Sequence, residues 1–252
     1  MIDIPRTPSF RLEGRSAFVS GGSSGIGLAA AAALVEAGAE VVLAARSADK
    51  LTEAAGALGS QAHAHALDMT DLAAVNAYFA AADRFDIIVN CAGCNRPKPM
   101  ADVTAADYNA VLDLNLKATY FVTQAAAAKM QAAKRPGSFI HVGSQMGHVG
   151  AANRTLYCAS KWGLEGFSKA LAVELAPYSI RSNTIAPTFI ETPLTKPYFE
   201  DEAFRRDVLG KIKLGRIGQV EDLMGAVLFL ASDASALVTG TSIVVDGGWT
   251  AE

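Results

Sequence analysis

The sequence has little of what extracellular, membrane-bound or nucleic-acid-binding proteins need. It has three cysteines in 252 residues, an odd number that does not make a disulfide framework and that favours a reducing compartment. No apolar run reaches the roughly 18–20 residues that cross a bilayer, and no apolar stretch follows a basic start at the N-terminus. These absences predict a cytoplasmic protein with no membrane partner.

Charge is also scarce and evenly spread. The chain has 22 basic and 25 acidic residues, a net charge of −3, and no basic cluster. A nucleic-acid partner therefore has no electrostatic support. The sequence has no linker rich in proline, glycine or serine, and 51% of its residues are hydrophobic. It is predicted to form one domain over residues 1–252, with a loose arm at residues 1–11.

Short apolar runs alternate with longer stretches rich in alanine and leucine. The apolar runs predict strands at residues 16–20, 40–45, 63–67, 86–90, 138–142, 180–185 and 242–245. Helical patterns lie near residues 25–37, 71–83, 104–130, 157–176 and 220–231. Several strands are apolar on both faces, as expected in a parallel sheet covered by helices on both sides. The pattern predicts an α/β fold of the Rossmann type, with a doubly wound and mostly parallel seven-stranded sheet.

Residues 188–215 interrupt this alternation. The segment has two prolines, several aromatic residues and mixed charge, and it follows a predicted strand end. Ligands bind outside the carboxyl ends of the strands in such sheets. We therefore expect this segment to form a lid over a substrate.

A glycine-rich turn, GGSSGIG at residues 21–27, lies between the first predicted strand and the first predicted helix. Its glycines allow a tight turn and let backbone amides approach a pyrophosphate at the helix N-terminus. The spacing G-x-x-x-G-x-G differs from the commoner G-x-G-x-x-G, but its position predicts a dinucleotide site. The candidate cofactor residues here are Gly21, Ser23, Ser24, Gly25, Ile26 and Gly27.

The end of the second strand indicates which dinucleotide is preferred. An acid at this position would accept hydrogen bonds from the ribose hydroxyls, but the sequence has Arg46 followed by Ser47. A guanidinium suits a 2′-phosphate, so NADP(H) is favoured over NAD(H), and a solvated surface arginine is the alternative. Further candidates at the same edge are Asp68, Met69, Asn90, Ala92 and Gly93.

Three residues carry the chemistry that the sequence predicts. Ser144 follows the fifth strand, and Tyr157 and Lys161 share one face of a helix because they are four residues apart. An ammonium beside a phenol stabilises the phenolate, which makes the tyrosine a proton donor or acceptor near neutral pH. A hydroxyl at residue 144 can hold a substrate carbonyl oxygen against that phenol.

The glycine-rich turn, the residues Asn90–Gly93, Ser144 and the pair Tyr157 and Lys161 occur in this order along the chain. They resemble the motif series of the short-chain dehydrogenase/reductase family, and the resemblance covers about residues 11–250. The resemblance implies that Tyr157 is the catalytic acid/base and that Ser144 orients the substrate carbonyl. It also implies that Lys161 lowers the pKa of Tyr157 and binds the ribose of the cofactor. It also implies that the backbone carbonyl of Asn115 holds a proton-relay water and that relatives assemble as homotetramers. Cofactor contacts that it adds are Tyr157, Lys161, Pro187, Ile190 and Thr192.

The candidate substrate residues are unusually polar. They are Ser144, Tyr157, Arg96, Met146, Asn153, Arg154 and Phe189. The loop around Arg96 resembles that of gluconate 5-dehydrogenase-like members, and Arg96 or Arg154 could pair with a substrate carboxylate or form a surface salt bridge instead. We expect a nicotinamide-dependent oxidoreductase that interconverts a secondary alcohol and a ketone on a sugar acid, polyol or hydroxyketone.

Two alternatives stay open. The first is a 3-oxoacyl-thioester reductase of the same family, although the sequence has no evident basic patch for an acidic carrier protein. The second is a dinucleotide-binding sensor without turnover, since fold does not determine function. Cys91 and Cys94 form a C-x-x-C pair, but no second pair completes a zinc site, so no metal is expected.

Overall fold

The computed structural model describes residues 3–252, and seven parallel strands form the centre of the protein. The sheet order is β3-β2-β1-β4-β5-β6-β7, so the direction of winding reverses between β1 and β4. The strands are β1 (Ser16–Ser20), β2 (Glu40–Ala45), β3 (Ala62–Ala66), β4 (Ile87–Asn90), β5 (Gly137–Val142), β6 (Ile180–Pro187) and β7 (Ser242–Val245). This confirms the predicted Rossmann-type fold, and every strand pair is parallel.

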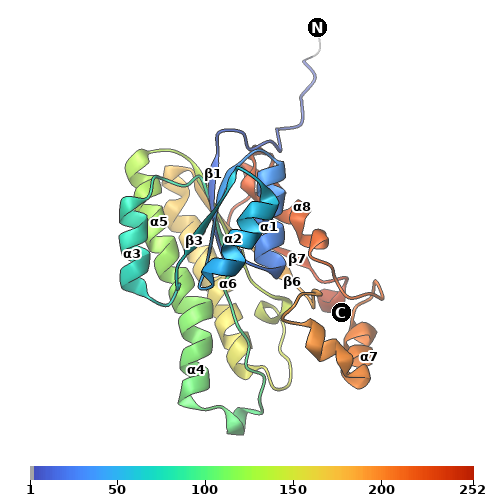
Figure 1. Cartoon of the computed structure of the whole chain (residues 1–252). Coiled ribbons are helices and arrows are strands. Elements are labelled where there is room, and N and C mark those ends of the chain that lie inside the picture. Colours follow the sequence, from blue (N-terminus) through green and yellow to red (C-terminus); the bar gives the residue numbers. More distant parts are fainter. Residues whose placement is uncertain (1–2) are drawn as a thin grey trace.

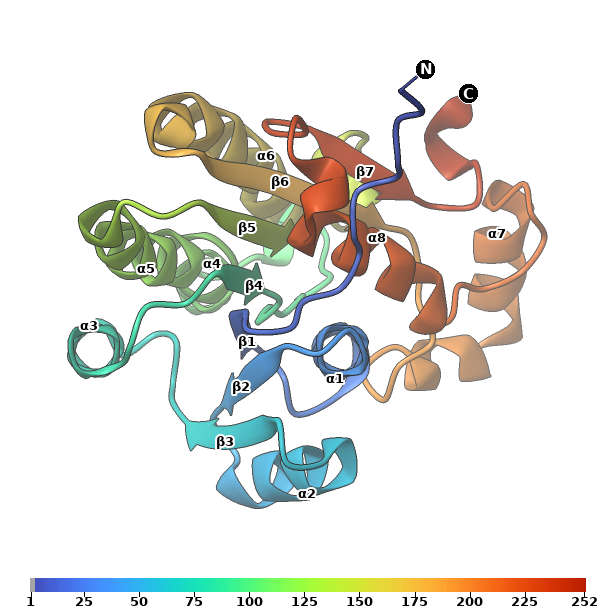
Figure 2. The same ribbon diagram turned by 90° about the horizontal axis from the view of Figure 1, so that it is seen from above.

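Helices cover both faces of the sheet (Figures 1 and 2). They are α1 (Gly25–Glu36), α2 (Ala48–Leu58), α3 (Leu72–Ala81), α4 (Ala105–Leu112), α5 (Thr119–Ala133), α6 (Thr155–Leu175), α7 (Glu202–Lys211) and α8 (Glu221–Ala231). Seen from above, α1 and α8 lie on one side of the strands, and α3, α5 and α6 lie on the other (Figure 2).

Two apolar cores follow from the alternation of side chains along each strand. In β1, Ala17 and Val19 belong to the core beneath α1, α2 and α8, whereas Phe18 belongs to the core beneath α3, α5 and α6. All three side chains are fully buried. Burial on both faces explains the continuous apolar runs of the central strands, such as β4 and β5, whereas the edge strands β3 and β7 are partly exposed.

The predicted helix at residues 104–130 is divided into three parts. Thr104 and Asp107 form a capping box that starts α4, and α5 ends at Lys134 in the left-handed conformation. Between them, residues 113–118 form a π-helical segment. Such segments displace the backbone from the regular hydrogen-bond ladder and occur often at functional sites.

Two helices were not predicted. Helix α2 connects β2 to β3, and α7 lies within the 188–215 segment, which also contains a short 3-10 helix at Lys196–Glu200. Asp201 caps α7 by accepting hydrogen bonds from two backbone amides. Of the predicted arm, residues 3–10 are exposed and lie outside helices and strands (Figure 1), and residues 1–2 lie outside the described part.

Candidate active site

The glycine-rich turn lies where the winding of the sheet reverses, and it contacts the end of β4. The Ser20 hydroxyl accepts hydrogen bonds from the backbone amides of Cys91 (3.0 Å) and Ala92 (3.2 Å). Gly21 has a φ of +70°, and a Cβ on Gly27 would overlap the carbonyl group of Gly21. The chain therefore packs against itself too closely for side chains at these positions, which leaves the amides at the start of α1 accessible.

A cavity of about 420 Å³ extends from this turn to the ends of β2 and β3. We call it the glycine-turn cavity. Asp68 accepts hydrogen bonds from the Thr70 amide (2.9 Å) and hydroxyl (2.8 Å), which lower the pKa of its carboxyl group, with a smaller contribution from Arg46. The predicted residues that line it are Gly21, Ser23, Ser24, Gly25, Ile26, Gly27, Arg46, Ser47, Asp68, Met69, Ala92, Gly93 and Thr192.

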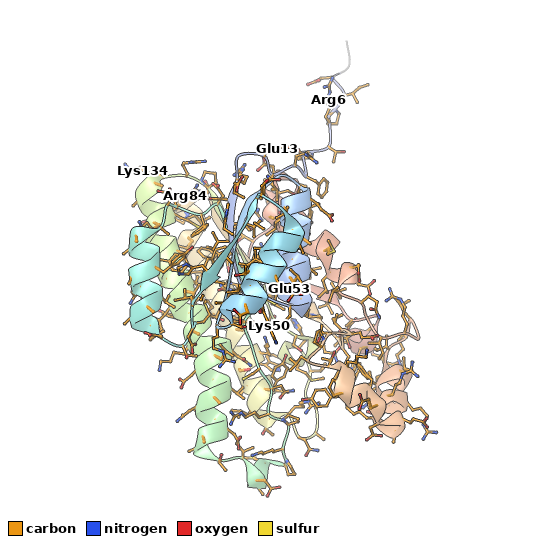
Figure 3. The ribbon with its side chains drawn as sticks, in the orientation of Figure 1. Arg6, Glu13, Lys50, Glu53, Arg84 and Lys134 are labelled. Carbon is orange, nitrogen blue, oxygen red and sulfur yellow. The ribbon has the colours of Figure 1, made fainter. Side chains whose placement is uncertain are left out.

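Sequence reasoning missed Lys50 in this cavity. The residue lies in the first turn of α2, at the end of the molecule where the strands terminate, whereas Arg84 and Lys134 lie at the opposite end (Figure 3). Lys50 follows Arg46 by four residues, so a helix starting there would have placed both cations on one side. Because helix α2 was not predicted, the four-residue spacing of Arg46 and Lys50 did not indicate that both side chains face the cavity.

A second cavity of about 210 Å³ contains Ser144, Tyr157 and Lys161, and we call it the tyrosine cavity. The Lys161 ammonium donates a 2.8 Å hydrogen bond to the carbonyl of Val142 and lies 5.6 Å from the centre of the Tyr157 ring. Ser144 Oγ accepts a 3.1 Å hydrogen bond from the amide of Met146, which leaves the hydroxyl proton free to be donated.

The two cavities are continuous in their lining. Residues that line both are Ile26, Cys91, Gly93, Thr192 and Leu194. Pro187, the last residue of β6, and Ile190, near the start of the 188–215 segment, line the tyrosine cavity. An elongated ligand held at the glycine-rich turn would therefore reach the tyrosine.

Asn115 connects the β4 loop to helix α6 from within the π-helical segment. Its side-chain oxygen accepts a hydrogen bond from the Cys94 amide (2.8 Å), and its amide group donates to the Cys94 carbonyl (2.9 Å) and the Ser160 hydroxyl (3.1 Å). Ser160 in turn donates to the carbonyl of Tyr157 (2.7 Å). The backbone carbonyl of Asn115 accepts a bond from Thr119, and its role toward a water stays a prediction.

Asn90 does not line either cavity, in contrast to the prediction. It is buried, and its amide donates to the Thr123 hydroxyl (3.0 Å) and contacts His141 Nδ1 (3.1 Å). His141 Nε2 lies 3.2 Å from the Ser182 hydroxyl. Burial, together with the nearby Lys161 ammonium, lowers the pKa of His141 to about 3, so the ring is neutral. Asn90 thus holds the sheet together beneath the site.

The two arginines proposed for substrate binding lie in different surroundings. Arg154 lines the tyrosine cavity, as do Met146 and Phe189. Arg96 does not: its guanidinium pairs with Asp107 (3.2 Å), as does Lys98 (2.7 Å). Hydrogen bonds from Lys98, Thr104 and Arg96 hold the pKa of Asp107 well below its ordinary value. Arg96 thus forms the salt bridge that was the alternative for it, and a contact of Arg96 with substrate stays a prediction.

Asn153 is also outside the cavity. Its side chain is exposed, its φ is +59°, and its carbonyl accepts a hydrogen bond from the Lys98 amide (3.2 Å). Residues of the tyrosine cavity that the sequence did not indicate include Cys91, Cys94, Leu194 and Tyr198. Burial raises the pKa of the Cys91 thiol to about 12 and also raises that of Cys94, so neither is a ready nucleophile.

Within residues 3–252, no group of three or more His, Cys, Asp or Glu side chains is arranged to hold a metal ion. None of the helices in that range is both long and apolar enough to span a membrane.

Comparison with known proteins places this site in context. Residues 21–250 match a family model described as enoyl-(acyl carrier protein) reductase. The chain is 35% identical to the D-erythrulose reductase of Gallus gallus, over 96% of the chain and 98% of that protein. It is 37% identical to a 3-oxoacyl-[acyl-carrier-protein] reductase of Thermotoga maritima, over 94% and 98% of the two chains.

A solved structure is also similar throughout. It is a gluconate 5-dehydrogenase from Burkholderia cenocepacia J2315 in complex with NADP and tartrate, with a TM-score of 0.92 and 34% identity over 96% of this chain and 98% of that chain.

Proposed function

Because the chain belongs to the short-chain dehydrogenase/reductase family of oxidoreductases, we propose that it interconverts a secondary alcohol and a ketone on a small polar substrate with NADP(H). One observation carries the proposal: Ser144, Tyr157 and Lys161 line one cavity, and that cavity adjoins the glycine-turn cavity. A dinucleotide site and a proton-transfer site are thus adjacent. The sugar-related names of two similar proteins support a substrate with several hydroxyl groups.

The residues of the glycine-turn cavity fit a nicotinamide dinucleotide. The turn has no room for a Cβ at Gly27, which matches the close backbone approach that a pyrophosphate needs. Arg46 and Lys50 would hold a 2′-phosphate. The end of β2 has no acidic residue that would repel this phosphate. When bound, the cofactor supplies or accepts the hydride.

The protein's own groups bind the carbonyl and move the proton. In the reductive direction, the Ser144 hydroxyl donates a hydrogen bond to the carbonyl oxygen and holds it beside Tyr157. The phenol donates its proton to that oxygen as negative charge develops there, and the Lys161 ammonium stabilises the resulting phenolate. Oxidation uses the same groups in reverse, with the phenolate accepting the alcohol proton. Phe189, Leu194 and Tyr198 line the cavity beside these groups.

The position of the 188–215 segment supports its role as a lid. It contributes several side chains to the tyrosine cavity, among them Phe189, Leu194 and Tyr198. The segment contains five acidic and five basic residues. A balanced charge offers no special attraction for an acidic carrier protein, which favours a free small molecule over a carrier-bound 3-oxoacyl thioester.

We also propose that the protein is a homotetramer that forms through α5, α6 and the edge strand β7. Large apolar side chains lie exposed on these elements: Tyr120 (44%), Trp162 (53%), Val173 (79%) and Val244 (41%). Such groups are common in contacts between subunits. Light scattering after size-exclusion chromatography would measure the mass, and a monomer would contradict the proposal.

The decisive experiment measures oxidation of NADPH and, separately, NADH against ketones, keto acids, keto sugars and a 3-oxoacyl thioester. Tyr157→Phe is the blank. We expect turnover of polar ketones by the wild type alone. Faster turnover of the thioester than of every small ketone would favour the 3-oxoacyl reductase. Cofactor binding without turnover of any compound would contradict the proposed activity and favour a sensor.

A further inference from the structure

The tyrosine cavity has an unbalanced charge. Two cationic side chains line it, Lys161 and Arg154, and no aspartate or glutamate does. Lys161 is already engaged, because it donates to the Val142 carbonyl and lies over the Tyr157 ring. Arg154 is therefore the cation that is available to a ligand.

Nothing in the described chain neutralises Arg154. Among residues 3–252, its guanidinium makes no hydrogen bond or ion pair, although the side chain is half-buried. Arg96 provides a contrast, because Asp107 balances both it and Lys98. A guanidinium held at a cavity wall without a counter-ion gains most when an anion arrives, since the surrounding protein screens charge less than water does.

The location of Arg154 relates it to the reacting group. It immediately precedes α6 and lies three residues before Tyr157. The first turn of α6 has no acidic residue, and no side chain caps its N-terminus, so the amides there add positive potential. Phe189, Leu194 and Tyr198 complete an apolar wall of the same cavity. A substrate whose carbonyl lies at Ser144 and Tyr157 would thus have a second group near Arg154.

On the premise of the proposed function, we propose that Arg154 binds a carboxylate of the substrate and selects hydroxy acids and keto acids over neutral polyols and ketones. The planar guanidinium matches a carboxylate through two parallel hydrogen bonds. One available cation matches one negative charge, whereas a phosphate ester would bring nearly two. Arg154 would thus bind the carboxylate, while Ser144 and Tyr157 bind the carbonyl group that reacts.

The test compares pairs of substrates with the same carbon skeleton, a keto acid and its methyl ester, in the wild type and in Arg154→Gln. We expect kcat/KM for the acid to fall about 10- to 100-fold, as for loss of a charged hydrogen-bond pair, and that for the ester to stay within about twofold. Arg154→Lys should restore part of the preference. Arg6→Gln is the matched control, because this exposed arginine of the N-terminal arm lies outside both cavities and outside the 188–215 segment (Figure 3).

Other outcomes would overturn the inference. Equal losses of kcat/KM on acid and ester would indicate a structural role for Arg154. Values of kcat/KM that stay at the wild-type level for both substrates would show that Arg154 does not recognise the substrate. A loss of acid preference in Arg96→Gln alone would assign recognition to the β4 loop. Preference for a phosphate ester over the keto acid, dependent on Arg154, would replace the carboxylate with a phosphate.

A binding measurement separates this inference from the proposed function. Calorimetric titration of the cofactor-saturated protein with butyrate, a monocarboxylate, and with neutral butyramide needs no turnover. Weaker butyrate binding in Arg154→Gln, with no change for butyramide, would support the anion site even if no ketone were reduced. Equal binding in both proteins would contradict the site even if the enzyme were active.

Discussion

Lys161 lies with its ammonium nitrogen 5.6 Å from the centre of the Tyr157 ring, and the same nitrogen donates a 2.8 Å hydrogen bond to the carbonyl of Val142. One cation thereby connects Tyr157 on α6 to the end of β5, two residues before Ser144. The relative positions of the three groups depend on this connection. It explains why a buried ammonium is retained in an otherwise largely apolar region.

Replacement of the tyrosine tests the proton-transfer role. We expect Tyr157→Phe to lower kcat about 10²- to 10⁴-fold, the usual contribution of a positioned acid or base, and to weaken cofactor binding much less, because the other cofactor contacts remain. Steady-state rates and cofactor fluorescence titration measure the two effects. Tyr178→Phe is the control, because that ring is exposed at the end of α6. Wild-type activity in Tyr157→Phe would assign proton transfer to another group.

The proposed NADP(H) preference is tested at Arg46, after β2, and at Lys50, in the first turn of α2. Arg46→Ala should raise the KM for NADPH about 10- to 100-fold, through loss of charge-assisted hydrogen bonds, and Lys50→Ala should raise it less. Neither change should affect the KM for NADH by more than about twofold, because NADH has no 2′-phosphate. Parallel effects on both cofactors would show instead that these residues support the shape of the cavity. Arg6→Ala, in the exposed N-terminal arm, controls for the change in net charge.

Alanine substitutions at two glycines distinguish the effect of close packing on stability from the effect of helix propensity. A Cβ at Gly27 would overlap the Gly21 carbonyl, so Gly27→Ala should lower the free energy of unfolding by about 1–3 kcal/mol and weaken cofactor binding. Gly56 lies in α2 with no atom within 4 Å of such a Cβ. Gly56→Ala should therefore stabilise the protein by about 0.5–1 kcal/mol. Denaturant unfolding measures both, and the same sign for both variants would contradict the packing argument.

The buried histidine predicts a dependence of stability on pH. The pKa of His141 is about 3 in the folded protein and about 6.5 when unfolded. Between these values the unfolded chain binds a proton that the folded chain does not, so stability falls as the pH falls from about 6.5. His141 should contribute a slope of up to about 1.4 kcal/mol per pH unit.

His141→Gln provides the comparison. Acidic groups such as Asp107 also lose stabilising interactions at low pH, so the difference between the two proteins isolates the histidine. Urea unfolding at several pH values from 4.5 to 7 should give a shallower slope for the variant. Parallel lines for both proteins would show that His141 does not remain neutral in the fold.

Most of the sheet, and the grouping of Ser144, Tyr157 and Lys161 in one cavity, could be predicted from the sequence for a simple reason. In a parallel sheet the carboxyl ends of the strands share one edge, so residues that follow strands, such as Ser144 and Gly93, must lie together. Tyr157 and Lys161 share a helix face through local spacing alone. These relationships require no knowledge of tertiary contacts.

Side-chain direction at loops could not be predicted in the same way. Arg96 and Arg154 are chemically alike, and only the position of Asp107 on α4 distinguishes them. Asn90 has the polarity of a ligand residue, yet its partners Thr123 and His141 are distant in sequence and draw it into the core. Helix α7, with three charged residues among its first five, has too little apolar pattern to stand out from a loop.

The C-terminal turn at Trp249–Ala251 packs against the 188–215 segment. The Trp249 ring centre is 5.9 Å from that of Phe189, which lines the tyrosine cavity, and 5.4 Å from the Lys211 ammonium. The chain has two tryptophans, and the other, Trp162, is exposed on α6. With Trp162 replaced by phenylalanine, the emission of Trp249 becomes an intrinsic optical signal from the substrate side of the protein, through which binding can be followed in real time without a label.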